Sequence, residues 1–308
     1  MRLGIVQSAP VYLDKQSSLQ KILGLMEEAA KQEVDLIAFG ETWFSGYPAW
    51  LDFCPGAALW DNQDVKQVYA QTVESSVSTS SPEIQQIAQA AKNYGQVVVL
   101  GVNERVESGP GNRSLFNSIF TITADGLLAN AHRKLVATFT EKLVYSHGDG
   151  AGLKSVDTKF GRLGSLVCWE HWLPMARQAM HNCGEDIHIA LWPWVHDRHQ
   201  VACRHYAFEG RCYVVGVGQK MLGKELPDTL ALPEGFDPNT EVLKGGSCVV
   251  KPNGEYLLEP DFDTDGLIVV DFEPVQMGIE EQMTLDVTGN YARWDVFDFG
   301  VNRKRPGE

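Results

Sequence analysis

The stretch Gly164-Ser165-Leu166-Val167-Cys168-Trp169-Glu170-His171-Trp172-Leu173-Pro174 decides how the rest of this chain is interpreted. Residues 162–167 end an extended, largely apolar run, and residues 173–180 predict a helix with Pro174 near its start. Cys168 therefore lies on a tight strand-to-helix turn, beside backbone N–H groups at a helix N-terminus. Because those groups favour an anion, the position predicts a lowered thiol pKa and a cysteine nucleophile. A buried structural cysteine is the alternative interpretation.

Composition limits the class of protein. The chain has 308 residues, of which 44% are apolar and 21% charged, values typical of a globular protein. Its net charge of −14 argues against a nucleic-acid partner, which requires a basic surface. No apolar run approaches the roughly 20 residues that span a bilayer, and residues 1–7 lack the features of a signal peptide. The cysteines form no Cys-x-x-Cys pair, so we expect reduced thiols and a cytoplasmic location. They are Cys54, Cys168, Cys183, Cys203, Cys212 and Cys248.

A carboxylate follows the second predicted strand. Residues 34–39 are apolar, too few for a helix, and bounded by Gly40. Glu41 comes next, followed by an aromatic loop. Apolar surroundings raise a carboxyl pKa, which makes Glu41 a candidate general base. Taken alone, Glu41 is better explained as a residue that caps a loop.

A lysine leaves the strand end of a predicted hairpin. Residues 115–123 and 127–132 form the two arms, turned at Asp125-Gly126, and Lys134 follows the second arm. An ammonium at a strand end can lie beside a reaction centre, although most such lysines are exposed. Glu141 places a second carboxylate near it.

Strands and helices alternate along the chain without a linker or repeat, which predicts one α/β domain. Residues 220–243, rich in proline, glycine and charge, predict a surface excursion, and Arg303-Lys304-Arg305 predicts a solvated tail. The other expected helices are 17–32, 61–75, 82–93 and 199–210, and the other expected strands are 3–8, 96–102, 187–192, 212–217, 245–251, 256–259 and 266–271.

Two short patterns do not support a cofactor. Residues 218–224 match the spacing of a phosphate-binding loop, but Glu225 stands where Ser or Thr must bind magnesium. A histidine-rich group has no structural zinc spacing, and helix periodicity does not bring all its members to one face. We therefore expect neither a metal nor an organic cofactor. The members of that group are His196, His199, Cys203 and His205.

In order and surroundings, Glu41, Lys134 and Cys168 resemble the Glu-Lys-Cys triad of the nitrilase (carbon–nitrogen hydrolase) superfamily. The Cys-Trp-Glu-His form is similar to the nitrilase branch rather than to the amidase or carbamoylase branches. Glu141 matches the additional glutamate of the family. The segments that carry the resemblance are Phe39-Gly40-Glu41-Thr42, His132-Arg133-Lys134-Leu135, Cys168-Trp169-Glu170-His171 and Ala207-Phe208-Glu209-Gly210-Arg211-Cys212.

The resemblance implies a four-layer α-β-β-α sandwich in a single domain. Residues 1–308 would form the carbon-nitrogen hydrolase domain, with a core at about 1–271 and a C-terminal extension at 272–308 that serves as an interface. It also implies a homo-oligomer built from dimers through the helices that flank the cysteine turn. The short end after Trp294 favours a closed oligomer over a filament. The apolar residues 48–55 and 57–60 predict an exposed contact patch.

The same resemblance assigns the chemistry. A thiolate suits attack on the weakly electrophilic carbon of a small-molecule nitrile. Cys168 would carry a thioimidate and then a thioester, Glu41 would move the proton, and Lys134 with the Trp169 N–H would stabilise charge. Carboxylic acid and ammonia would result. Aromatic side chains beside these segments predict a flat slot for aryl or arylacetonitriles, formed by Trp169, Tyr47, Trp192 and Pro193 with Trp194.

Other interpretations stay open. An amidase uses the same triad, and some relatives act on cyanide. A scaffold without activity would keep the fold, and a Cys-His-Asp hydrolase would use His171 or His188 instead of Lys134. The identity of the nitrile and the ratio of acid to amide product are open as well.

Overall fold

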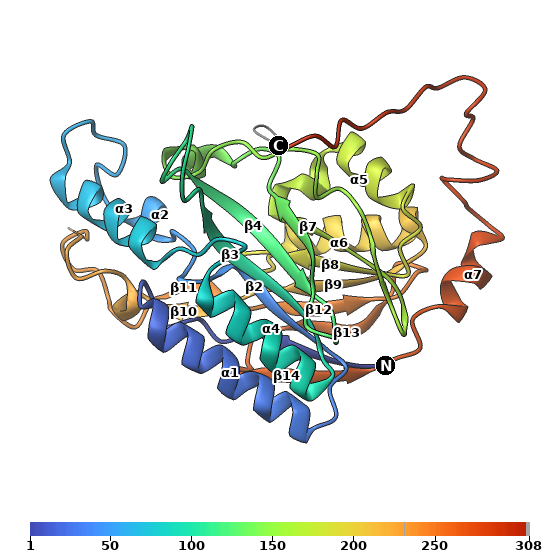
Figure 1. Cartoon of the computed structure of the whole chain (residues 1–308), viewed down its shortest axis with the longest axis horizontal. Coiled ribbons are helices and arrows are strands. Elements are labelled where there is room, and N and C mark those ends of the chain that lie inside the picture. Colours follow the sequence, from blue (N-terminus) through green and yellow to red (C-terminus); the bar gives the residue numbers. More distant parts are fainter. Residues whose placement is uncertain (231, 306–308) are drawn as a thin grey trace.

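Two six-stranded sheets form the centre of the structure, a computed structural model that describes residues 1–230 and 232–305 (Figure 1). In each sheet three central strands are parallel and the flanking strands are antiparallel. In sheet order, the first contains β14 (Leu267–Asp271), β1 (Arg2–Val6), β2 (Leu36–Phe44), β3 (Val97–Arg105), β4 (Leu115–Ile122) and β5 (Leu128–Arg133). The second contains β13 (Tyr256–Asp261), β12 (Ser247–Val250), β9 (Tyr213–Val217), β8 (Ile187–Leu191), β7 (Gly161–Val167) and β6 (Val156–Thr158).

The first sheet is apolar on both faces because its strands alternate between two buried environments. In β2, Leu36 and Ala38 belong to the cluster that includes the second sheet, whereas Ile37 and Phe39 belong to the cluster beneath the outer helices. Side chains of successive strand residues point to opposite faces, so one strand serves both layers. Helices α1 (Lys15–Lys31) and α4 (Pro82–Tyr94) cover the outer face, and the Asp14 cap starts α1 two residues earlier than expected.

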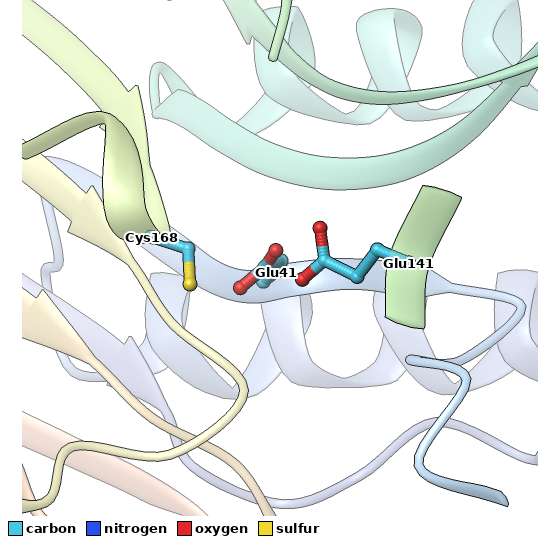
Figure 2. A group of neighbouring side chains, drawn as sticks. All are labelled: Glu41, Glu141 and Cys168. Carbon is cyan, nitrogen blue, oxygen red and sulfur yellow. The ribbon is translucent and has the colours of Figure 1, made fainter. Parts of the chain in front are cut away.

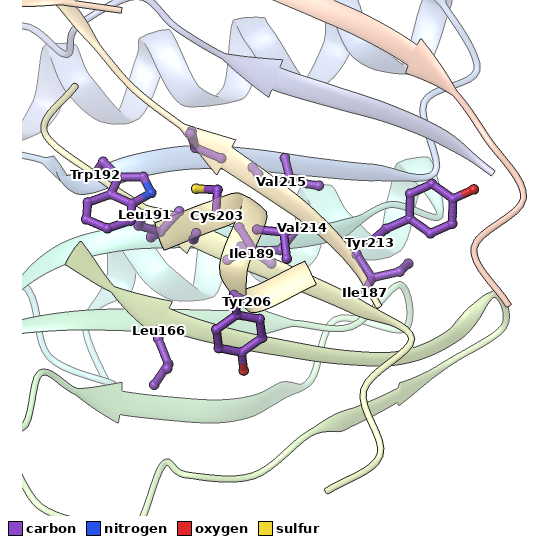
Figure 3. Close-up of a cluster of buried hydrophobic side chains, with 14 of the residues drawn as sticks. Leu166, Ile187, Ile189, Leu191, Trp192, Cys203, Tyr206, Tyr213, Val214 and Val215 are labelled. Carbon is purple, nitrogen blue, oxygen red and sulfur yellow. The ribbon is translucent and has the colours of Figure 1, made fainter. Parts of the chain in front are cut away.

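Helices α5 (Pro174–His181) and α6 (Asp197–Gly210) pack on the second sheet. Tyr206 and Cys203 of α6 lie among the buried side chains of β7, β8 and β9 (Figure 3). This completes the predicted four-layer α-β-β-α sandwich. The remaining helices are α2 (Trp50–Phe53), α3 (Gln63–Ser75), α7 (Gln276–Gln282) and the 3-10 turns η1 (Phe139–Leu143), η2 (Cys168–Trp172) and η3 (Gly223–Glu225).

The segment at 220–243, expected as a surface excursion, contributes buried structure instead. Its ends pair as the small sheet β10 (Lys220–Leu222) and β11 (Glu241–Lys244). Met221, Leu226 and Leu230 are buried in a third apolar cluster with Trp50. Composition gave the wrong prediction for this segment because its charged residues lie outward while the intervening apolar residues pack inward. Residue 231 of this segment lies outside the described residues.

The apolar stretch at 48–55 was expected to be an exposed patch, and that prediction is wrong. Trp50, Leu51 and Cys54 are buried in the same third cluster. The large apolar residues that are exposed belong to the neighbouring segment, Leu59 at 68% and Trp60 at 89%.

The C-terminal segment runs along the outside of the molecule after α7 and returns toward β4 and α5 (Figure 1). Arg303 and Lys304 are exposed, as expected of a solvated tail, but both arginines of this cluster also bind the rest of the fold. Arg303 donates to the carbonyl of Leu153 at 3.1 Å, and Arg305 pairs with Asp149 at 3.1 Å. Residues 306–308 of the predicted extension lie outside the described residues. Within the described part of the chain, no helix combines the length and apolarity needed to cross a membrane.

Candidate active site

Cys168 lies on the strand-to-helix turn that its neighbours predicted. Strand β7 ends at Val167, the short turn η2 follows, and α5 begins at Pro174. Cys168 itself has a φ of +52°, in the left-handed region that non-glycine residues rarely adopt. Such a conformation costs about 1–3 kcal/mol and persists only where the surroundings hold it. The nucleophile candidate therefore depends on the residues packed around its backbone.

Glu41 lies within β2 rather than after it. The strand continues past Gly40 to Phe44, but its register with β3 shifts between Phe39 and Phe44. Gly101 of β3 permits this, since a Cβ there would lie 2.0 Å from the carbonyl oxygen of Gly40. The distortion brings the backbone at Glu41 close against β3, and its side chain is fully buried.

Lys134 joins two carboxylates at the centre of the site. Its Nζ donates to Glu41 Oε1 at 2.9 Å and to Glu141 Oε2 at 2.6 Å, and its side chain is 1% exposed. The adjoining loop is packed tightly, because a Cβ at Gly148 would lie 2.5 Å from the carbonyl oxygen of Lys134. Asn117 also donates to Glu41 Oε1, at 2.7 Å.

Glu141 lies in η1 and has its own supports. The backbone N–H of Thr138 donates to Glu141 Oε2 at 2.9 Å, and the hydroxyl of Tyr47 donates to Glu141 Oε1 at 3.1 Å. The structure thus brings together all four residues predicted as catalytic, and it adds Tyr47 at their edge.

The thiol and the two carboxylates converge on one point (Figure 2). The sulfur of Cys168 and one oxygen each from Glu41 and Glu141 all lie within 4.8 Å of one another. Glu41 Oε2 has no hydrogen-bond partner among the described residues, which leaves a lone pair for a proton. Sulfur and carboxylate oxygen are donor types that also bind metals, but here the ammonium of Lys134 bridges the two carboxylates.

The electrostatics suit proton transfer between Cys168 and Glu41. Burial raises the pKa of Glu41 to about 7, against the lowering effect of Lys134. Burial alone would lower the pKa of Lys134, but the neighbouring acidic groups of Cys168, Glu141 and Glu41 raise it well above its ordinary value. The site therefore holds a permanent ammonium and a base that titrates near neutrality.

The expected lowering of the Cys168 pKa is wrong for this buried thiol. Burial and the nearby charge of Glu41 raise its pKa well above the ordinary value. Lys134 and a hydrogen bond from the Trp169 N–H act in the opposite direction but do not outweigh them. The thiol consequently rests protonated, and a base must remove its proton before attack.

Glu170 connects the cysteine turn to the lysine loop. It accepts from the backbone N–H groups of Val167 at 2.8 Å and Leu135 at 2.7 Å, and from the ring of His132 at 2.9 Å. Burial acts to raise the pKa of Glu170, but His132 and these N–H groups outweigh it and lower the pKa. Glu170, His132 and Asn117 had no predicted role. Asn117 could have been found, because a polar residue within an apolar strand indicates a candidate site residue.

A cavity of about 440 Å³ opens onto Cys168 and Glu141. Three residues predicted to bind substrate, Tyr47, Trp169 and Pro193, line it. Trp192 does not, which corrects that prediction: it is fully buried, stacked on His171 and His199. Strand β8 ends at Leu191 and the chain bends at Pro193 and Trp194, which leaves Trp192 inside and Trp194 at the cavity. The cavity is also lined by Ala49, Asp52, Phe53, Thr138, Phe139, Thr140, Trp194, His196, His199, Thr240, Glu241, Val242, Leu243 and Lys244.

Comparisons with known proteins agree with this geometry. The family model described as carbon-nitrogen hydrolase matches residues 2–278. The chain is 36% identical to "Nitrilase 2" of an unknown prokaryotic organism, covering 99% of this chain and 93% of that protein. It is 32% identical to the aliphatic nitrilase of Sinorhizobium fredii, covering 98% and 96%.

Solved structures share the fold. Nit3 of Saccharomyces cerevisiae, a member of branch 10 of the nitrilase superfamily, has a TM-score of 0.71 at 18% identity, covering 94% of this chain and 96% of that one. An amidase from Nesterenkonia sp. has a TM-score of 0.64 at 19% identity, covering 90% and 92%. The family match and the curated relatives together identify this chain as a member of the carbon-nitrogen hydrolase family.

Proposed function

We propose that this carbon–nitrogen hydrolase is a nitrilase, which converts an organic nitrile and two water molecules to a carboxylic acid and ammonia. The observation that carries the proposal is the buried group of Cys168, Glu41 and Lys134 at the base of a cavity with aromatic walls. This group combines a thiol, a base with a pKa near 7 and a fixed ammonium. The sequence similarity to nitrilases over nearly the full chain supports a nitrile as substrate.

In the first half-reaction Glu41 Oε2 accepts the thiol proton while the sulfur of Cys168 bonds to the nitrile carbon. The proton then passes to the nitrile nitrogen, which gives a neutral thioimidate and returns Glu41 to its carboxylate form. Lys134 and the N–H of Trp169 stabilise negative charge on that nitrogen. One such donor contributes about 3–4 kcal/mol in known oxyanion sites.

In the second half-reaction Glu41 activates water for addition to the thioimidate carbon. The tetrahedral adduct expels ammonia and leaves a thioester. A second water then cleaves the thioester to the acid and restores the thiol. Glu141 serves by holding Lys134 at 2.6 Å and, with Tyr47, by shaping the place where water approaches.

Ammonia release from a panel of aliphatic, arylaceto- and aromatic nitriles, each beside its matched amide, tests this proposal. A nitrilase hydrolyses the nitriles faster, and Cys168→Ala serves as the control for background hydrolysis. Faster turnover of the amides would favour an amidase, the alternative with which the likeness to a solved amidase is also compatible. Preferred turnover of cyanide would redirect the assignment to cyanide hydrolysis.

We also propose that the chain acts as a cytoplasmic homo-oligomer built from dimers, with no nucleic-acid or membrane partner. All six cysteines lie in the described part of the chain and are unpaired, as in a reducing compartment. Met175 of α5 and Val201 of α6 are 70% and 58% exposed, and Trp294 and Phe297 add apolar surface in the segment after α7. Such surfaces support an interface formed by α5, α6 and the extension at 272–308 beyond the core at about 1–271.

A further inference from the structure

A chain of three buried side chains connects the interior of the second sheet to the backbone of Cys168. The Nδ1 of His171 lies 2.7 Å from the carbonyl oxygen of Cys168, and its Nε2 lies 3.0 Å from Nε2 of His188. The Nδ1 of His188 lies 2.5 Å from Oε2 of Glu185. The opposite oxygen of Glu185, Oε1, accepts from the hydroxyl of Tyr206 at 2.6 Å. All three members are buried, and the mechanism above uses none of them.

Hydrogen-bond chemistry fixes the number of protons on this chain. A carbonyl oxygen only accepts, so Nδ1 of His171 must carry hydrogen. The contact between the two Nε2 atoms needs one hydrogen, and the contact between His188 and Glu185 needs another. Three contacts therefore need three hydrogens, one more than two neutral imidazoles and a carboxylate possess. The additional proton can lie on Glu185, His188 or His171, and in each case the trio has no net charge.

Losing that proton breaks one of the three contacts. With Glu185 ionised and both imidazoles neutral, either two Nε2 lone pairs face each other or a lone pair faces an acceptor oxygen. A buried polar group left unpaired in this way costs about 1–3 kcal/mol. A change of tautomer in the two imidazoles can place the unpaired contact at the carbonyl of Cys168.

We propose that His171, His188 and Glu185 form a buried relay that holds one proton and thereby positions the Cys168–Trp169 peptide for the reaction. The carbonyl of Cys168 and the N–H of Trp169 belong to one trans peptide and point in opposite directions. A donor that fixes the carbonyl consequently fixes the direction of the N–H, which we assigned to charge stabilisation. It also supports the positive φ of Cys168. These are positioning residues, since none of them lines the cavity.

The surroundings favour the proton on Glu185. Burial raises the pKa of Glu185 to about 7, while burial lowers the pKa of His171 to about 3 and that of His188 well below its ordinary value. Since the folded pKa of Glu185 exceeds that of a free carboxyl, the relay is complete at low pH and loses its proton as pH rises through about 7. The ionisable groups that face the relay from neighbouring elements are His181 and Arg177 of α5, Tyr206 and Glu209 of α6, Cys212 before β9, and Glu170 with His132 on the side of the cysteine turn.

Two substitutions of His171 test the positioning role, which rests on the proposed nitrilase reaction. His171→Phe retains a ring against Trp192 but has no donor, whereas His171→Asn retains a donor that can reach the carbonyl of Cys168. We expect His171→Phe to lower kcat at least about 10-fold and to leave KM within about twofold of the wild-type value. The loss should be smaller than the 10²–10³-fold cost of removing an oxyanion donor, because the Trp169 N–H is misdirected rather than absent. We expect His171→Asn to recover most of that loss. Wild-type kcat in His171→Phe would overturn the proposal.

Two further substitutions test the proton. In Glu185→Gln an amide N–H replaces the acid O–H toward His188, and the amide oxygen still accepts from Tyr206. We expect the wild-type rate to fall between about pH 7 and 9, and we expect this variant to keep kcat at neutral pH and to lose that fall. Tyr206→Phe removes a donor that stabilises the carboxylate, so the fall should move to higher pH. A Glu185→Gln profile that falls like the wild type would overturn the relay, and so would a wild type with no fall.

An infrared titration separates this proposal from the nitrilase assignment because it needs no substrate. The difference between wild type and Glu185→Gln should contain a carboxylic-acid carbonyl band that disappears as pH rises through about 7. Comparison with Glu185→Gln removes the contribution of Glu41, which titrates in the same range. Absence at pH 6 of both this band and an imidazolium band from His171 or His188 would refute the relay even in an enzyme that hydrolyses nitriles. Presence of either band would support the relay even if nitriles are not the substrate.

Discussion

Replacing Lys134 by methionine should destabilise the fold as well as abolish activity. The ammonium lies between the side chains of Glu41 and Glu141, which are 0% and 3% exposed. Without it, two carboxylates remain within 4.8 Å of each other. At an effective dielectric constant of about 20, two unit charges at that separation repel by about 3 kcal/mol. Because the pKa of Glu41 is already about 7 beside the ammonium, protonation of Glu41 relieves this repulsion at pH 7, and the full repulsion applies at higher pH.

The expected loss in the free energy of unfolding is therefore about 3–5 kcal/mol, the range for a buried ion pair that loses one partner. Urea unfolding at pH 9 measures it. The deficit should shrink as pH falls toward 7, because burial gives Glu41 a folded pKa of about 7, above that of the unfolded chain, so that Glu41 binds a proton there.

A matched control distinguishes charge repulsion from loss of packing. The triple variant Lys134→Met, Glu41→Gln, Glu141→Gln has neither the ammonium nor the two carboxylates, so it should recover most of the stability. Both proteins should release ammonia from nitriles at least about 100-fold more slowly than the wild type. If the single variant unfolds within about 0.5 kcal/mol of the wild type, or the triple variant is no more stable than the single one, the ion-pair argument is refuted.

Four other outcomes are expected. Cys168→Ala should abolish ammonia release with an unchanged circular dichroism spectrum. Intact-mass analysis of the wild type with a slow nitrile should place the adduct on Cys168, and an adduct elsewhere would contradict the assignment. The rate should fall below about pH 7, where the carboxyl of Glu41, with a pKa of about 7, becomes protonated and cannot accept the thiol proton. Glu41→Gln should block acylation in single-turnover kinetics, and normal acylation would exclude Glu41 as the base. Aryl and arylacetonitriles should exceed acetonitrile in kcat/KM because aromatic side chains wall the cavity; faster turnover of the smallest nitriles would contradict this. Light scattering after size exclusion should find a dimer or larger species, whereas a fully active monomer would contradict the coupling of assembly to activity.

The strands and helices were predictable from the sequence because they carry strong local signals, whereas the four-layer arrangement was implied by the family resemblance. The cysteine turn, the hairpin of β4 and β5 and the helices α1, α4 and α6 all lie within a few residues of their expected positions. Their apolar runs, glycines and caps act locally, so neighbouring residues are sufficient to specify them.

The differences arise where distant parts of the chain meet. The pKa of Cys168 depends on burial and on Glu41, more than a hundred residues away, and a local helix-end argument contains neither. Trp192 was assigned to the cavity because its segment lies beside the triad segments, but its ring stacks inward on His171, a contact that its own segment does not reveal. Residues 48–55 are buried because they pack against residues 220–243. Composition alone predicts a surface loop for that second segment. The His171–His188–Glu185 chain was equally invisible, since its members come from separate elements.

Directed-evolution libraries aimed at this enzyme should treat two glycines as if they were active-site positions. A methyl group at Gly101 would overlap the carbonyl oxygen of Gly40, and one at Gly148 would overlap that of Lys134. Backbone atoms cannot rotate aside as a flexible side chain can, so even alanine must displace the segment that carries Glu41 or Lys134. A mutational scan scored by activity should therefore find these side-chain-free positions as intolerant as the triad, while the exposed residues Leu59 and Trp60 accept most replacements in an isolated subunit.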